Sequence, residues 1–333
     1  MTLHPHAEKF LERLQAIGAP AYHTLGPTMA RAAMASGYAL MAAQLTPVNV
    51  SKVDNQTVVT AKRDTPIRIY WPELPGLARP QPPFADAPER LFPLVVFIHG
   101  GGFVLGDLDQ YDDMCRRLCQ ASSSIIVSIG YGLAPESKFP DPVEECYTVV
   151  NWAVRHALEL GADKTRIAIS GDSAGGNLAA AVTLLARDRG GPKLTYQVLM
   201  YPTVDLYGQT ESKVKNGTGY FLEAEDMFWF RSCYLPDERD ARDPLASPLL
   251  APDHTNLPPA LVITAEFDPL HDEGEAYAGT LREAGVPVEH RNYAGMIHGF
   301  MSMTWMFEDG REAIELAGAR LREAFDGAAA AGD

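Results

Sequence analysis

The hydrophobic positions of this 333-residue chain fall into short apolar runs separated by helix-like stretches. Continuous apolar runs, as expected for strands buried on both faces, occupy residues 94–98, 124–129, 166–170, 196–201 and 260–265. The helix-like stretches cover residues 114–121, 143–160, 177–189 and 273–284, and a last strand and helix are expected at 287–293 and 312–325. Alternation of strand and helix predicts an α/β fold with a mostly parallel sheet flanked by helices.

Four further regions lie outside this alternation. Residues 1–45 are helical in pattern, which suits either a cap over a site or a terminal helix packed on the core. Residues 49–60 and 66–71 suit an antiparallel pair that opens the sheet. The Pro-rich residues 71–93 predict a surface loop, because proline has no N–H to give to a strand ladder. Residues 205–247, rich in aromatic and polar side chains, are expected to form an inserted helical piece.

The net charge of −15 disfavours nucleic acids and anionic membrane surfaces as partners. No apolar run reaches the ~18 residues that span a bilayer, and no secretory signal is visible at the N-terminus. The cysteines lack the spacing of a zinc site, so no metal is expected. Reduced structural thiols are the favoured interpretation, which fits a cytoplasmic protein. They are Cys115, Cys119, Cys146 and Cys233.

The sequence Gly-Asp-Ser-Ala-Gly-Gly at 171–176 lies between an expected strand and an expected helix. A Gly-x-Ser-x-Gly in this setting is typical of a nucleophile elbow, a turn so tight that only glycine fits on either side of the serine. The turn predicts that the hydroxyl of Ser173 is held out above the edge of the sheet.

A serine hydroxyl needs a base to take its proton, and the base needs an acid that orients it. On an α/β-hydrolase fold the base follows the serine along the chain. Four histidines do so, and His298 lies in a loop directly after the strand at 287–293. His290 is inside that strand, His271 starts a helix, and His254 precedes a strand, so we expect His298 to be the base.

The acid is expected at the end of a preceding strand. Asp268 ends the apolar run that begins at 260, and Pro269 stops the strand there. Glu266, Asp272 and Glu273 are competitors, but the last two are expected to cap or charge the first turn of the next helix. Asp268 is therefore the predicted acid.

His-Gly-Gly-Gly at 99–102 directly follows the strand at 94–98. Successive glycines let backbone N–H groups point at a ligand, and each such donor in an oxyanion hole contributes roughly 3–4 kcal/mol. A phosphate-binding loop is the alternative, but no Lys-Ser or Lys-Thr follows the glycines. The glycines therefore favour an oxyanion hole.

Five motifs occur together in one order, and they carry a resemblance over about residues 45–325. The chain resembles the hormone-sensitive-lipase-like family of α/β-hydrolase esterases, in its bacterial branch. The motifs are His-Gly-Gly-Gly at 99–102, Tyr-Gly-Leu-Ala-Pro-Glu at 131–136, Gly-Asp-Ser-Ala-Gly-Gly at 171–176, Asp-Pro-Leu-His-Asp-Glu-Gly at 268–274 and His-Gly-Phe at 298–300.

The resemblance implies a catalytic triad and an oxyanion hole. The triad would be Ser173, Asp268 and His298. The N–H groups of the oxyanion hole would come from Gly101, Gly102 and Ala174, with His99 and Gly100 supporting the loop.

The resemblance also implies a helical cap, built from residues 1–48 and the insert 205–247, over a catalytic domain at 49–333. Dimers are common in the family. The family usually has arginine where this chain has Gly132, so the packing around Tyr131 and Glu136 is expected to differ.

The expected reaction is hydrolysis of soluble short- to medium-chain acyl esters through an acyl-enzyme, without a metal or organic cofactor. Amide or lactone hydrolysis by the same triad, a lipase acting at oil–water interfaces, and a noncatalytic small-molecule receptor on the same fold are the alternatives. Phe103, Phe300, Phe221 and Trp229 are candidates for the pocket wall, although each could equally be core.

Overall fold

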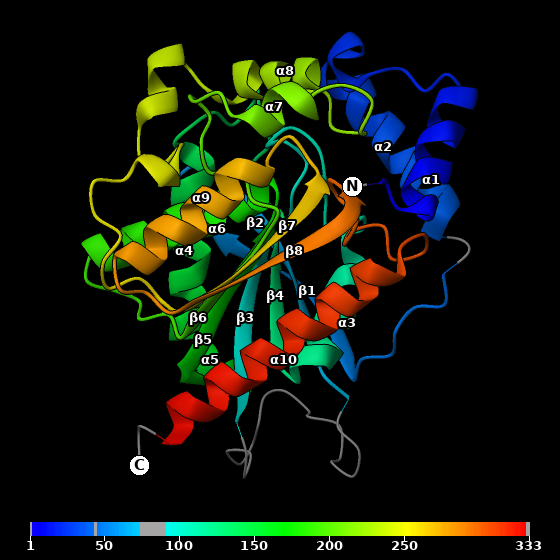
Figure 1. The fold of residues 1–333 in the computed structure, drawn as a ribbon. Coiled ribbons are helices and arrows are strands. Elements are labelled where there is room, and N and C mark those ends of the chain that lie inside the picture. Colours follow the sequence, from blue (N-terminus) through cyan, green and yellow to red (C-terminus); the bar gives the residue numbers. More distant parts are fainter. Residues whose placement is uncertain (1, 43–44, 74–90, 331–333) are drawn as a thin grey trace.

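The computed structural model describes residues 2–42, 45–73 and 91–330, and at its centre is an eight-stranded, mostly parallel sheet (Figure 1). Its order is β1-β2-β4-β3-β5-β6-β7-β8, with β2 antiparallel to both neighbours and the other pairs parallel. This confirms the predicted fold class and the antiparallel opening pair. The strands are β1 Lys52–Val59, β2 Asp64–Trp71, β3 Phe92–Ile98, β4 Ile125–Ile129, β5 Ala162–Asp172, β6 Tyr196–Met200, β7 Ala260–Phe267 and β8 Val288–Ile297.

Helices cover both faces of the sheet, and each face has its own apolar core. One face carries α3 (Asp112–Ser122) and α10 (Glu308–Ala330), which pack so closely that a Cβ on Gly318 would lie 2.5 Å from Ala121. The other carries α4 (Asp141–Arg155), α6 (Ala174–Asp188) and α9 (His271–Glu283). The helix expected at 143–160 is divided at His156 into α4 and the short α5 (Ala157–Leu160).

A third group of helices lies at the top of Figure 1, beyond the carboxyl ends of β7 and β8. It combines the N-terminal residues with the region between β6 and β7. His23 and Asp226 join these two parts, since the backbone N–H of His23 donates to the carboxylate at 2.9 Å and its ring Nδ1 lies 2.8 Å from the same oxygen. The elements are α1 Pro5–Ala16, η1 Tyr22–Thr24, α2 Gly26–Ala42, α7 Glu211–Lys215, α8 Ala224–Tyr234, η2 Glu238–Arg242 and η3 Pro248–Leu250.

Two expectations from composition can be compared with the described residues. All four cysteines are free thiols, and Cys115, Cys119 and Cys146 are buried. Within the described ranges, no helix combines the length and apolar character needed to cross a membrane. Most of the predicted Pro-rich loop, residues 74–90, lies outside the described part of the chain.

Candidate active site

Ser173 lies in a strained turn between β5 and α6. Its backbone has φ 53° and ψ −120°, a conformation that costs a non-glycine residue about 1–3 kcal/mol. The turn is closed on both sides by glycine, because a Cβ on Gly171 would lie 2.3 Å from the carbonyl oxygen of Gly175, and one on Gly175 would lie 2.0 Å from that of Ile98. The N–H of Ser173 donates to Met200 in β6 at 2.9 Å, so two strands hold the turn.

The structure brings together the three residues predicted as a triad. The Nε2 atom of His298 lies 2.9 Å from the hydroxyl of Ser173, and its Nδ1 atom lies 2.7 Å from Oδ2 of Asp268. The other carboxylate oxygen of Asp268 accepts the N–H of Leu270 at 2.8 Å. Asp268 is fully buried, and Ser173 and His298 are 9% and 6% exposed. A neutral imidazole with its proton on Nδ1 can therefore accept the serine proton at Nε2.

The competing histidines and acids have partners elsewhere. Asp272 and Glu273 lie in the first turn of α9 as expected, but no described side chain caps that helix. Glu273 is fully buried, and its carboxylate is bound outside the helix. The remaining competitors pair as follows: His254 with the carbonyl of Pro248, His271 with Asp272, His290 with Thr264, and Glu266 with the N–H of Gly295.

The glycine loop after β3 leaves backbone N–H donors open. Gly101 and Gly102 have φ of 108° and 60°, which glycine adopts without strain. No hydrogen bond between described residues uses the N–H of Gly101, Gly102 or Ala174, whereas that of Gly100 donates to Asp172 at 2.7 Å. Ala174 also begins α6, whose N-terminus favours negative charge.

Asp172, which the sequence analysis did not single out, supports this loop. Its buried carboxylate accepts the N–H of Gly100 and, at 3.0 Å, the hydroxyl of Tyr111. Burial raises the pKa of Asp172 to about 6. The only signal in the sequence is a carboxylate that directly follows the buried run 167–171.

His99 is a second support of the loop. Its ring stacks on Tyr131 with centroids 4.4 Å apart, and its Nδ1 atom lies 2.8 Å from the carbonyl oxygen of Gly100. The hydroxyl of Tyr131 donates to the carbonyl of His99 at 3.0 Å. Burial lowers the pKa of His99 to about 4, so the ring is neutral at pH 7.

The predicted pocket aromatics fall into two groups. Phe103 and Phe300 are almost fully buried, and Phe103 stacks on Tyr234 with ring centroids 3.8 Å apart. Phe221 and Trp229 are partly buried in the region between β6 and β7.

Phe230, which the sequence analysis did not place at the site, lies against the glycine loop. A Cβ on Gly102 would lie 2.3 Å from its ring. The absence of a side chain at 102 is therefore what allows this aromatic ring of α8 to approach the loop.

The structure explains how the chain accommodates Gly132. The N–H of Gly132 donates to Glu145 at 2.9 Å, and a Cβ there would lie 2.3 Å from the hydroxyl of Ser137. Both carboxylate oxygens of Glu136, in the same motif, accept hydrogen bonds from Arg31 of α2.

Arg31 also reaches the backbone of two neighbouring loops. It donates to the carbonyl of Ala134 at 2.7 Å and to that of Val104 at 2.9 Å. Val104 belongs to the loop that carries Gly101 and Gly102, so Arg31 links α2 to the surroundings of Ser173.

A family model described as alpha/beta hydrolase fold matches residues 95–302. Carboxylic ester hydrolase LipN of Mycobacterium tuberculosis is 48% identical over 63% of this chain and 58% of its own length, so the chain spans less than two thirds of that relative. Ethyl acetate hydrolase of Pseudomonas putida is 37% identical, covering 78% of each chain. The solved hyperthermophilic esterase of the archaeon Pyrobaculum calidifontis is 39% identical, covers 97% of this chain and 99% of its own, and superposes with a TM-score of 0.89.

Proposed function

We propose that this chain, which belongs to the hormone-sensitive-lipase-like α/β-hydrolase family and is a carboxylesterase, hydrolyses esters through a triad of Ser173, His298 and Asp268. The observation that carries the proposal is the continuous chain of short contacts from the serine hydroxyl through the imidazole to a fully buried carboxylate. In this arrangement the imidazole can take a proton while the carboxylate stabilises the resulting charge.

The reaction proceeds in two acyl-transfer steps. The oxygen of Ser173 attacks the ester carbonyl while Nε2 of His298 takes the hydroxyl proton. The tetrahedral intermediate collapses, the C–O bond to the alcohol breaks, and His298 gives its proton to that alcohol. Water then attacks the acyl-serine in the same way, His298 takes a proton from the water and returns it to Ser173, and the carboxylic acid leaves.

The N–H groups of Gly101, Gly102 and Ala174 hold the oxyanion of both intermediates. Two features support this assignment: these donors have no hydrogen-bond partner among the described residues, and Ala174 directly follows the serine at the start of a helix. The N–H of Gly100 is already bound to Asp172, so it supports the loop rather than the oxyanion. Each open donor contributes roughly 3–4 kcal/mol to stabilisation of the transition state.

Residues 1–48 and 205–247 form a cap, and the substrates are soluble short- to medium-chain esters. The position of α1, α2, α7 and α8 beyond the strand ends supports a cap, as does the link between His23 and Asp226 (Figure 1). The relative from Pseudomonas putida is named for ethyl acetate, a short ester, and this supports the chain-length preference.

The test is Ser173→Ala, with the exposed Ser232→Ala as the matched control. Ser173→Ala should abolish turnover of nitrophenyl acetate and labelling by a fluorophosphonate probe, while Ser232→Ala should retain both. Turnover by folded Ser173→Ala above background would refute the triad. In a series of nitrophenyl esters, acetate and butyrate should be hydrolysed faster than palmitate, and the reverse order would refute the proposed substrate class.

A further inference from the structure

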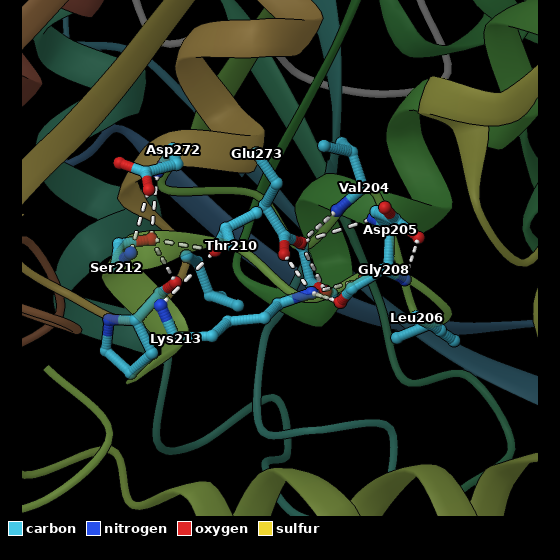
Figure 2. Close-up of polar contacts among 12 residues, drawn as sticks. Val204, Asp205, Leu206, Gly208, Thr210, Ser212, Lys213, Asp272 and Glu273 are labelled. Atoms are coloured by element: carbon cyan, nitrogen blue, oxygen red, sulfur yellow. Dashed lines mark hydrogen bonds and ion pairs between the residues drawn. The ribbon is translucent and has the colours of Figure 1, made fainter. Parts of the chain in front are cut away.

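Glu273 is a fully buried carboxylate that the proposed chemistry does not use. One oxygen accepts three hydrogen bonds, from the hydroxyl of Thr203 at 3.0 Å and from the N–H groups of Val204 at 2.8 Å and Asp205 at 3.2 Å (Figure 2). The other lies 2.6 Å from the ammonium of Lys213. Burial raises the pKa of Glu273, and the positive charge of Lys213 opposes that rise. Among the residues that the structure describes, Lys213 is the one cation paired with this carboxylate.

Lys213 belongs to α7, in the region between β6 and β7, and its side chain is 11% exposed. Figure 2 shows its stem running below Glu273 toward Gly208, with the ammonium between the carboxylate and two carbonyl groups. Those carbonyls are of Asp205 at 2.7 Å and Gly208 at 2.9 Å. The three oxygens match the three protons of an ammonium group, so the cation is fully bound.

The loop that binds Glu273 also contacts the backbone of the nucleophile. Residues 201–205 follow β6, and the N–H of Thr203 donates to the carbonyl of Ser173 at 3.2 Å. The side chain of Thr203 thus binds Glu273, and its backbone binds Ser173. A shift of this loop would displace the N–H group that binds the carbonyl of Ser173, the residue with the strained backbone.

Helix α7 is joined to the loop of the proposed acid as well. Ser212, next to Lys213, donates its hydroxyl to the carbonyl of Pro269 at 2.7 Å, and Asn216 donates to that of Asp268 at 3.2 Å. Glu273 lies about one helical turn after Pro269, in α9. The ion pair therefore sits between the backbone of the nucleophile and that of the acid.

We infer that Lys213 and Glu273 are positioning residues of the active site. Their ion pair fixes the spacing of Ser173 and Asp268 through the loop at 203–208, which both charged groups bind, and the loop at 268–269, which α7 binds. The inference rests on the proposed triad. A buried carboxylate that loses its only cation is strongly unfavourable, whereas replacing both charges together is often tolerated. Loss of one charge should therefore displace these loops, whereas replacing both charges together should leave them close to their parental positions.

The experiment compares Lys213→Met, Glu273→Gln and the double variant, with the exposed Lys215→Met of the same helix as control. The kcat and KM for nitrophenyl acetate, the rate of fluorophosphonate labelling, and urea unfolding are measured for each. Lys213→Met should lower kcat and the labelling rate about tenfold with KM nearly unchanged, because the reacting groups move while the pocket stays. The double variant should recover most of the loss, and Lys215→Met should match the parent.

A folded Lys213→Met with parental kcat would overturn the inference, as would a double variant whose loss equals the product of the single losses. If Lys213→Met does not fold, Glu273→Gln decides, because it preserves size and keeps Lys213: a lower kcat supports the inference and an unchanged kcat overturns it. Ser173→Ala, measured alongside, separates the two proposals. Activity in Ser173→Ala refutes the triad, whereas an inactive Ser173→Ala with an unaffected Lys213→Met refutes only the positioning role.

Discussion

Asp172→Asn should make the protein more stable at neutral pH and less active. The carboxylate of Asp172 is fully buried, and burial raises its pKa from 3.8 to about 6. Because the folded state binds the proton more tightly than the unfolded state, ionisation of the carboxylate opposes folding. Its destabilising effect grows as pH rises between about 4 and 6. Asparagine has the same shape and no charge to bury.

The magnitude follows from the two pKa values. Their difference corresponds to about 3 kcal/mol of destabilisation when Asp172 is fully ionised. At pH 4.5 the same linkage leaves about 1 kcal/mol, so the stability of the variant relative to the parent should rise by about 2 kcal/mol between pH 4.5 and pH 8. Activity should fall about tenfold, because the bond from Gly100 loses its charge assistance and the glycine loop is held less firmly.

Urea unfolding of both proteins at the two pH values measures this difference. The other titrating groups are common to both proteins, so they largely cancel in the comparison. A stability difference that stays constant between pH 4.5 and pH 8 would show that Asp172 is not titrating as its burial requires. A kcat equal to that of the parent would refute the role assigned to its bond with Gly100.

Three further substitutions test separate parts of the structure. Asp268→Asn should lower kcat on the order of 10⁴-fold with little change in folding, because an amide facing Nδ1 of His298 favours the wrong tautomer. Gly175→Ala should destabilise the fold by about 3 kcal/mol or more in urea unfolding, because its Cβ would overlap a backbone carbonyl. Arg31→Ala should lower the free energy of unfolding by about 1 kcal/mol, mainly through its two bonds to backbone carbonyls, since the carboxylate of Glu136 is largely exposed.

Each of these has a matched control elsewhere in the chain. Asp188→Asn, at an exposed ion pair, should keep the parental kcat. Gly279→Ala, in α9 with open space at its Cβ, should be neutral or stabilising in urea unfolding. Arg189→Ala removes a bidentate ion pair with Glu144 on the surface. Its decrease in the free energy of unfolding should therefore be smaller than that of Arg31→Ala. Equal losses in any of the three comparisons would contradict the corresponding argument.

The sheet could be predicted from the sequence because its central strands are buried on both faces, which leaves continuous apolar runs. The residues at which strands and helices begin and end were harder to predict. Strand β5 begins at Ala162, four residues before the predicted run, because Ala162 pairs with Phe92 of β3 across a register shift that skips the polar residues 163–166. The break between α4 and α5 at His156 leaves no gap in the apolar pattern, because Ala153 before it and Ala157 after it are both buried.

The sequence by itself determined the local parts of this protein: the strand–turn–helix around Ser173, the three glycines after β3, and the chain order of serine, acid and histidine. These depend on backbone sterics and on spacing, which residue identity encodes directly. The tertiary structure decided which distant groups meet, including Arg31 with the loops around Ser173 and Lys213 with Glu273. It also decided which carboxylates are buried, because the pKa of a group such as Asp172 depends on its surroundings in the fold and not on its neighbours in the chain.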